Sequence, residues 1–142
     1  MTTSTAASST SRFQHLSILE ATYTIAWIKV ALHVFGLERT LAWCRKRIGQ
    51  VPVHQQVSTA AVNEAVRRIA MAAAIFPGRA LCFEQSLAGF LCLRRRGVLV
   101  DFCLGVQPLG FTAHAWLEYH GRTVNEQGEL VRKLVRLPSI IQ

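Results

Sequence analysis

Apolar residues recur every three or four positions along the first two thirds of the chain, which is the spacing of helices with one buried face. This spacing predicts four helices, which cover about residues 16–35, 37–48, 58–76 and 81–96. Gly36 is expected to end the first helix with a left-handed residue, and the Ser58 hydroxyl can cap the third. The Pro77-Gly78 pair stops the third helix, and Gly97 stops the fourth. The N-terminal half is therefore predicted to be helical.

The fourth predicted helix has two different faces. One face carries bulky apolar side chains, and the other carries a stripe of small or polar residues at helical spacing. This stripe consists of Cys82, Gln85, Ser86 and Gly89. We expect it to let the helix lie close to a sheet or a cleft.

Beyond Gly97 the period of the pattern shortens to two, which is the spacing of strands. The alternation predicts strands over about residues 98–104, 112–119 and 122–126. Helical spacing returns from Leu130 to Leu137, and Pro138 closes this last predicted helix. Helices followed by an antiparallel meander are typical of the α+β class.

Length and composition describe one packed domain with an excess of positive charge. The chain has 142 residues, of which 51% are hydrophobic and 17% charged, and this excludes an intrinsically disordered chain. Sixteen Lys and Arg against eight Asp and Glu give a net charge of +8. Such a balance predicts an anionic partner, which is a nucleic acid, a membrane surface or an acidic peptide. The charge alone does not choose among the three.

The cysteines and the apolar segments bear on the compartment. No two cysteines are separated by only two residues, so the paired spacing of zinc ligands is absent. The chain begins with no basic-then-apolar signal sequence, and Lys29 and His33 interrupt the apolar segment Ala21–Leu37, which falls short of the roughly 20 residues of a membrane span. We therefore expect a cytoplasmic protein with reduced thiols and no membrane span.

Cys82 and His114 form a pattern that suits thiol chemistry. Cys82 lies at or near the start of a predicted helix, where free amide hydrogens and the helix dipole favour the thiolate. A nucleophilic thiol needs a base, and the base needs an acceptor that orients it. His114 lies on a predicted strand and shares its face with Trp116 and Glu118.

Two carboxylates are candidates to orient His114. Glu118 lies four residues along the same strand, roughly 13 Å away, which is too far for a hydrogen bond without a bend. Glu126 lies across a hairpin, and a two-residue turn at His120-Gly121 would place it on the opposite face. A three-residue loop, Tyr119–Gly121, would pair it directly with His114, and Gly121 supplies the left-handed residue that such loops need. The turn chemistry therefore predicts the three-residue loop and the pair His114–Glu126.

Several separated blocks of the sequence, from about Arg79 to Glu126, resemble the transglutaminase-like cysteine proteases of lasso-peptide maturation. The blocks are Cys82-Phe-Glu-Gln-Ser-Leu-Ala, Leu93-Arg-Arg-Arg-Gly97, Leu104-Gly-Val106, Phe111-Thr-Ala-His-Ala-Trp-Leu-Glu118 and Gly121-Arg-Thr-Val-Asn-Glu126. By this resemblance Cys82 is the nucleophile, His114 the general base and acid, and Glu126 the third member of a triad. The family more often has Asp at the third place, so Glu126 is a departure from its pattern.

The resemblance implies a leader peptidase that acts on a ribosomally synthesised lasso-peptide precursor, before a separate ATP-dependent cyclase closes the ring. It implies an α+β fold, in which a helical half packs on a transglutaminase- or papain-like core with an antiparallel sheet, and it requires no metal or organic cofactor. Some members carry an N-terminal leader-recognition domain, whereas the residues before Cys82 are predicted to be helices with no room for one. The expected partners are therefore the precursor peptide, a separate RiPP leader-recognition protein and the lasso cyclase.

The expected organisation is a disordered tail over residues 1–12 and a single peptidase domain over residues 13–142, helical at 13–78 and catalytic at 79–142. Gln85, one helical turn from Cys82, is a candidate oxyanion donor. Trp116 is expected to pack under the site, with substrate contact as the alternative.

The remaining three cysteines are expected to be buried as small apolar residues. Arg94, Arg95 and Arg96 complement the carbonyl end of their helix, and binding of an acidic leader or partner is the functional alternative.

Two other functions remain open. One is a basic, non-enzymatic module that binds nucleic acid or an anionic surface, but the sequence has no recognisable nucleic-acid motif, and we expect no nucleic-acid partner. The other keeps the triad and transfers the acyl group to an amine. Hydrolysis and transfer pass through the same thioester, so the sequence does not separate them.

Overall fold

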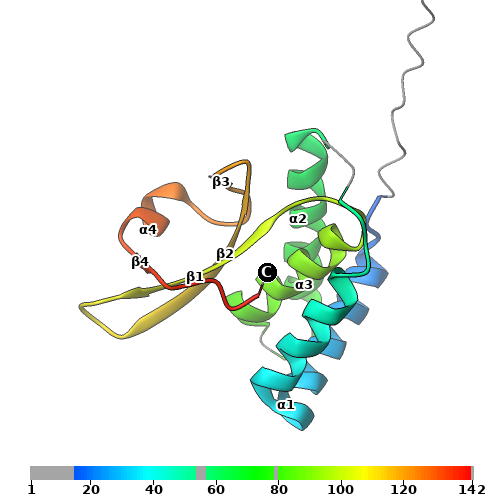
Figure 1. Ribbon diagram of the computed structural model, residues 1–142, viewed down its shortest axis with the longest axis horizontal. Coiled ribbons are helices and arrows are strands. Elements are labelled where there is room, and N and C mark those ends of the chain that lie inside the picture. The colour runs from blue at the N-terminus through cyan, green and yellow to red at the C-terminus, as the bar shows by residue number, and fades with distance from the viewer. Residues whose placement is uncertain (1–14, 54–56, 79, 142) are drawn as a thin grey trace, which may run out of the picture.

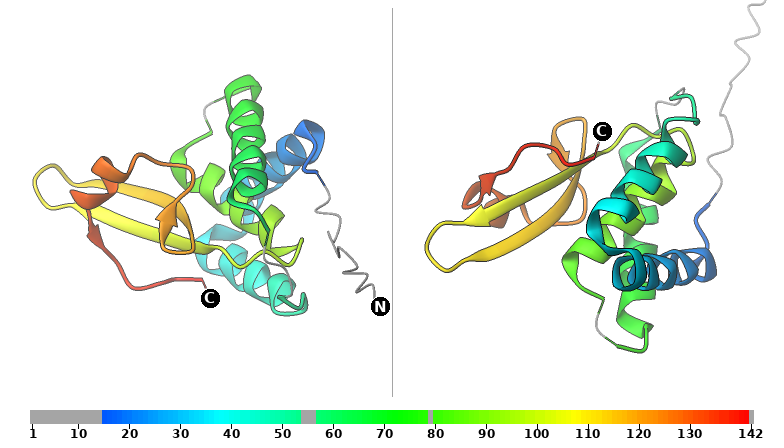
Figure 2. Two further views of the ribbon diagram at one scale, coloured as in Figure 1. Left: turned by 90° about the horizontal axis from the view of Figure 1, so that it is seen from above. Right: turned by 60° about the horizontal axis from the view of Figure 1, so that its bottom comes forward.

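The computed structural model describes residues 15–53, 57–78 and 80–141. The expected disordered tail, residues 1–12, lies outside these residues. A helical layer packs against a four-stranded antiparallel sheet (Figures 1 and 2). This arrangement is the predicted α+β fold with a helical N-terminal half.

The ends of the helices follow the predicted caps. The helical layer consists of α1 (Ile18–Ile48), α2 (Thr59–Ile75) and α3 (Cys82–Arg94). Gly36 breaks α1 with φ 78° and ψ 175°, which confirms the predicted boundary between the first two helices. The Ser58 hydroxyl accepts a hydrogen bond from the Ala61 amide at 3.2 Å and caps α2 as predicted.

The second half of the chain forms the sheet. Its strands are β1 (Asp101–Gln107), β2 (Thr112–Tyr119), β3 (Arg122–Thr123) and β4 (Val135–Arg136). They lie in the order β3-β2-β1-β4, and every neighbouring pair is antiparallel. The first three strands form the predicted meander, although β3 is shorter than expected. The hairpin of β1 and β2 extends beyond the helices (Figure 2).

The last segment differs from the predicted helix over residues 130–137. Only a short helix, α4 (Gly128–Arg132), forms there, and the residues after it become the edge strand β4. The Leu137 amide donates to the Leu104 carbonyl at 2.8 Å. Apolar residues three or four positions apart fit one helical turn followed by a strand equally well. The edge of β1 decides between the two, because its backbone groups need hydrogen-bond partners.

Helix α3 lies in the core and contacts α1, α2 and β2. Its residues from Ser86 to Leu93 are all buried. A Cβ atom added at Gly89 would lie only 2.8 Å from Leu117 Cδ1 of β2. This close approach confirms the prediction that the stripe of small residues lets the helix approach the sheet.

Helix α1 is long and apolar enough to cross a membrane, judged by length and composition alone. Length and composition thus do not decide the matter, and the absence of a membrane span stays a prediction. Core helices of soluble proteins can have the same length and composition. Ala21, Ile25 and Ile28 of α1 are fully buried in the core. Lys29 Nζ lies 3.3 Å from Glu84 Oε2 of α3, so the charge within the apolar segment is paired inside the domain.

A bidentate ion pair joins the start of α1 to the end of α3. Arg96 Nη2 lies 2.7 Å from Glu20 Oε2, and Arg96 Nη1 donates to Glu20 Oε1 at 3.1 Å and to the Cys92 carbonyl. The hydrogen bond from Arg96 lowers the pKa of Glu20. A carboxyl group whose pKa is lowered by folding adds stability above its unfolded pKa of about 4.3, and this stability is lost as the pH falls through the folded pKa.

Replacing Glu20 with Gln is expected to lower the free energy of unfolding at neutral pH by about 1–2 kcal/mol, because the mostly buried Arg96 loses its charged acceptor. Urea unfolding at neutral pH and below about pH 4 measures the effect, and the difference from the parent should shrink at the acidic pH. Glu38→Gln, at an exposed position of the same helix, is the control. An equal loss in both variants, or a difference that persists in acid, would contradict this role of the pair.

Candidate functional site

Cys82 is the first residue of α3 and follows the cap residue Leu81. The first amides of a helix have no partner within the helix and lie at the positive end of its dipole. The Glu84 carboxylate accepts the Leu81 amide at 2.7 Å, and its charge is offset by Lys29 at 3.3 Å. Cys82 is partly exposed, whereas the other three cysteines are buried as expected. The accessible thiol is therefore the one at the helix start.

Alkylation is expected to distinguish Cys82 from the other cysteines. Burial raises the pKa of Cys44 to about 12, that of Cys103 to about 11, and also raises the pKa of Cys92. The thiolate is the reactive form, so these three should react slowly near neutral pH. Iodoacetamide followed by peptide mass mapping should find the adduct on Cys82 in the folded chain and on all four cysteines after denaturation. Equally fast labelling of Cys103 in the folded chain would contradict this expectation.

His114 and Glu126 lie in contact. His114 Nε2 is 2.5 Å from Glu126 Oε2, and both side chains are largely buried, with about a fifth of each exposed. The second carboxylate oxygen of Glu126 accepts the Gln127 amide at 3.0 Å. The Glu126 carbonyl accepts the Thr123 hydroxyl at 2.9 Å. The carboxylate is therefore held on both oxygens, and His114 Nδ1 is the ring nitrogen left to exchange a proton with a thiol.

The turn that precedes Glu126 is not the predicted three-residue loop. Tyr119 pairs with Arg122, so the turn has two residues, His120 with φ 49° and Gly121 with φ 73°. Two left-handed residues in succession suit the hairpin turn whose twist matches that of the strands, and His tolerates this conformation better than most residues. If this register continued, Glu126 would lie opposite Ala115 on the wrong face. Another feature of the backbone must therefore bring Glu126 to His114.

Strand β3 ends at Thr123, before the register can place Glu126 opposite Ala115. The Val124 amide donates to the Leu117 carbonyl at 3.0 Å, but the Leu117 amide donates to the Asn125 side chain at 2.7 Å instead of to a strand carbonyl. A continued ladder would use the Val124 carbonyl for this bond. The Asn125 side chain thus replaces the backbone as acceptor, and the chain leaves the sheet one residue before Glu126.

A chain of hydrogen bonds connects the segments that hold the three candidate residues. Asn125 Nδ2 donates to Ser86 Oγ at 2.9 Å, and Ser86 Oγ donates to the Ala115 carbonyl at 3.0 Å. Ser86 is fully buried and lies one helical turn after Cys82. Ala115 is next to His114, and Asn125 is next to Glu126. The start of α3, the strand of His114 and the bend of Glu126 are therefore fixed to one another, although no hydrogen bond joins Cys82 to His114 in the described residues.

Asn125 is the site residue that the sequence reasoning missed. It lies in one of the blocks that carry the family resemblance, but it received no role there. The available signal was its position directly before the candidate acid at the end of a predicted strand. Asn at such a position competes with the backbone ladder for hydrogen bonds.

Replacing Asn125 with Ala is expected to lower the free energy of unfolding by about 1–3 kcal/mol, because the buried Leu117 amide loses its acceptor and Ser86 Oγ loses one of its two partners. Release of the Glu126 bend should also reduce the rate of any reaction at the site, by roughly 10- to 100-fold. Urea unfolding and kcat/KM test the two parts. Asn63→Ala, at an exposed position of α2, is the control, and identical behaviour of the two variants would contradict the role of Asn125.

The other candidate residues have structural partners. Gln85 Nε2 donates to the Ala80 carbonyl at 2.8 Å, so its amide would have to leave that bond to stabilise an oxyanion. Trp116 is 1% exposed, so it is a buried residue of the sheet and presents no surface to a substrate. Its indole nitrogen donates to Glu118 at 2.9 Å.

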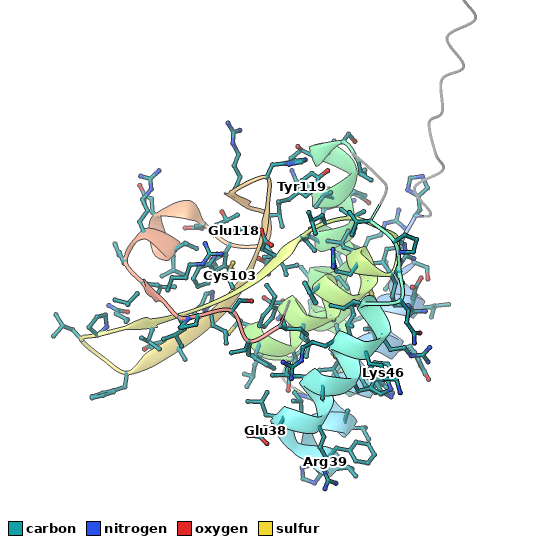
Figure 3. All side chains as sticks on the ribbon, viewed as in Figure 1. Glu38, Arg39, Lys46, Cys103, Glu118 and Tyr119 are labelled. Atoms are coloured by element: carbon teal, nitrogen blue, oxygen red, sulfur yellow. The ribbon has the colours of Figure 1, made fainter. Side chains whose placement is uncertain are left out.

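Glu118 belongs to a separate polar cluster. It also pairs with Arg136 at 3.1 Å, as expected for an ion-paired strand residue. Arg136 Nη2 donates to Cys103 Sγ at 2.9 Å, and Glu118 and Cys103 lie together on the side of the sheet that carries α4 (Figure 3). This cluster holds the C-terminal segment on β1 and β2. In the part of the chain that the structure describes, no three His, Cys, Asp or Glu side chains gather as metal ligands.

Comparison with known proteins identifies the family. The family model of the transglutaminase-like superfamily matches residues 26–139, which include Cys82, His114 and Glu126. Members of this superfamily are usually cysteine-dependent enzymes. No curated protein and no solved structure matches the chain significantly. The matched segment covers most of both the helical layer and the sheet, and the chain therefore belongs to the transglutaminase-like superfamily.

Proposed function

We propose that the protein is a cysteine peptidase that removes the leader peptide from a ribosomally synthesised lasso-peptide precursor. The observation that carries the proposal is the contact between His114 Nε2 and Glu126 Oε2. The strand of His114 is in turn hydrogen-bonded, through Ser86, to the helix that begins at Cys82. A thiol at a helix start, an imidazole and a carboxylate that orients it are the parts that thiol proteases require. The choice of substrate rests on the resemblance of the sequence blocks.

In the proposed reaction, the Cys82 sulfur forms a bond to the scissile carbonyl carbon after His114 Nδ1 has taken the thiol proton. The carbon–nitrogen bond then breaks, and His114 gives that proton to the leaving amine. Water attacks the thioester with His114 as the base, which releases the leader acid and restores the thiol. Glu126 holds the imidazole in position and stabilises its charged form. The Cys82 amide is the first candidate oxyanion donor, and Gln85 is the second once its bond to Ala80 is released.

The proposed partners are the precursor peptide, a separate RiPP leader-recognition protein and the lasso cyclase. Among the described residues, those before Cys82 form α1 and α2, and both helices pack on α3. They thus support the helix that begins at Cys82. Recognition of the leader by a separate protein rests on the resemblance of the sequence blocks.

The proposal is tested by a cleavage assay in which the precursor and the recognition protein are each present or absent. We expect release of a leader with a free carboxylate only when precursor, recognition protein and this protein are combined. A leader joined to an added amine would instead favour acyl transfer as the main reaction. Tight, steeply salt-dependent binding to DNA or RNA without any cleavage would favour the basic, non-enzymatic module.

A further inference from the structure

A cavity lies between α1 and the C-terminal end of α3. Its volume is about 530 Å³, and we call it the α1–α3 pocket. The residues that line it include Tyr23, Trp27, Trp43, Arg47, Leu91 and Arg95. Leu91 and Arg95 follow Cys82 by nine and thirteen residues, which at about 100° per residue places them on the opposite side of α3. A ligand in this pocket would therefore not occupy the side of α3 that carries Cys82.

The break of α1 at Gly36 builds the aromatic wall of the pocket. Trp27 precedes the break and Trp43 follows it, and their ring centroids lie 4.0 Å apart. The Arg47 guanidinium lies over the Trp43 ring, 5.2 Å from its centroid. The wall is therefore apolar, with a cation at one edge.

The three arginines at the end of α3 have different surroundings. Arg96 is engaged by Glu20 and by the Cys92 carbonyl, so its role is structural. Arg95 lines the α1–α3 pocket together with Arg47, and no Asp or Glu is among the described residues that line it. The Nε and Nη1 atoms of Arg94, in the same helical turn, are buried and have no hydrogen-bond partner in the described structure. Interaction with the helix dipole explains why positive residues lie at this end of α3. It does not explain why Arg95 and Arg47 both line a cavity beside the aromatic wall.

We propose that the α1–α3 pocket binds an acidic segment of a partner protein. Arg47 and Arg95 receive its carboxylates, and a large apolar side chain of the segment packs against Trp27 and Trp43. Guanidinium groups bind carboxylates through paired hydrogen bonds, and Trp and Arg are among the residues that most often dominate the binding energy of an interface. The inference rests on the proposed function only where it takes the partner to be the protein that delivers the precursor.

The shape of the pocket favours a peptide over other anions. Binding of single-stranded nucleic acid needs free aromatic faces on which successive bases stack. Here the two indole rings lie against each other, and Arg47 covers part of Trp43. An anionic membrane would need its aromatic side chains free to enter the lipid, whereas Trp27 packs on the core and lies against Trp43.

The test uses the full chain and a capped hexapeptide, Glu-Asp-Phe-Leu-Asp-Glu, with its Gln/Asn analogue as the uncharged probe. Binding is followed by calorimetry and by tryptophan fluorescence, since Trp27 and Trp43 line the pocket. We expect the acidic peptide to bind roughly tenfold or more tightly than its analogue, and the double variant R47E/R95E to lose that difference. Trp43→Leu should weaken the binding of both peptides.

The matched control is the double variant R45E/K46E, which makes the same change of charge on exposed residues outside the pocket (Figure 3 labels Lys46). It should bind the acidic peptide as the parent does. Equal affinity for the two peptides, or equal losses in the two double variants, would overturn the proposal. So would stronger pocket-dependent binding of an oligothymidine or of vesicles that contain phosphatidylglycerol. Because the readout is binding, a chain without peptidase activity would leave this inference intact, and failure to bind would leave the proposed peptidase intact.

Discussion

Replacing Cys82 with Ala is expected to abolish leader release, with a fall in kcat of roughly 10⁴-fold or more. Cys82 supplies the sulfur that forms the thioester, and the three other thiols are buried, so none can take its place. Alanine is the best helix-forming residue, and this change at the first position of α3 should leave the fold intact. Leader release is measured by mass spectrometry over time, and the fold by urea unfolding.

Cys92→Ala is the matched control for this prediction. Cys92 lies on the same helix but is buried, and its Sγ lies 3.6 Å from the Thr24 hydroxyl. Its replacement should lower stability and leave kcat close to that of the parent. Leader release by Cys82→Ala at a rate comparable to that of Cys92→Ala would exclude Cys82 as the nucleophile.

Replacing Glu126 with Ala is expected to lower kcat/KM by roughly 10²- to 10⁴-fold, the second largest effect. The change removes the carboxylate that touches His114 and would stabilise its charged form. Glu126→Gln keeps the shape and an acceptor for the Gln127 amide but removes the charge, so it should be nearly as impaired. Glu126→Asp introduces the residue that the family of similar sequences more often has at this place. Its carboxylate lies one methylene further from His114, but it keeps the charge and should retain more activity than Glu126→Ala or Glu126→Gln.

The control for Glu126 is Glu118→Gln. Glu118 is a partly buried carboxylate on the same strand as His114, but it pairs with Arg136 and accepts the Trp116 indole. Its loss should affect stability more than kcat/KM. Equal losses of activity in Glu126→Gln and Glu118→Gln would mean that the charge at Glu126 has no special function.

Much of the helical layer could be predicted because local chemistry determines it. Ser58 caps α2 through its own side chain, and Gly36 adopts a conformation that other residues rarely adopt. The stripe of small residues that contains Gly89 likewise predicted a close contact between the helix and the sheet. In each case the information lies within a few neighbouring residues.

The predictions were wrong where the local sequence is compatible with two structures and contacts with other segments decide between them. Residues 135–136 fit a helix or a strand, and the free edge of β1 selects the strand. At His120 and Gly121 a three-residue loop and a two-residue turn were both available, and the structure has the two-residue turn. The contact between His114 and Glu126 exists nevertheless, because Asn125 ends the strand with its side chain. A hydrogen bond from a strand amide to a side chain eight positions later cannot be deduced from an alternating pattern.

The proposed function requires that the chain cleave a peptide bond through a thioester on Cys82. The most direct test is mass spectrometry of the leader released from the precursor and recognition protein, with and without neutral hydroxylamine. A thioester intermediate predicts leader with a free carboxylate in buffer and leader hydroxamate when hydroxylamine is present, because the amine intercepts the acyl group before water does. An intact precursor in both reactions, or release of the free acid alone in the presence of hydroxylamine, would contradict cleavage through a Cys82 thioester.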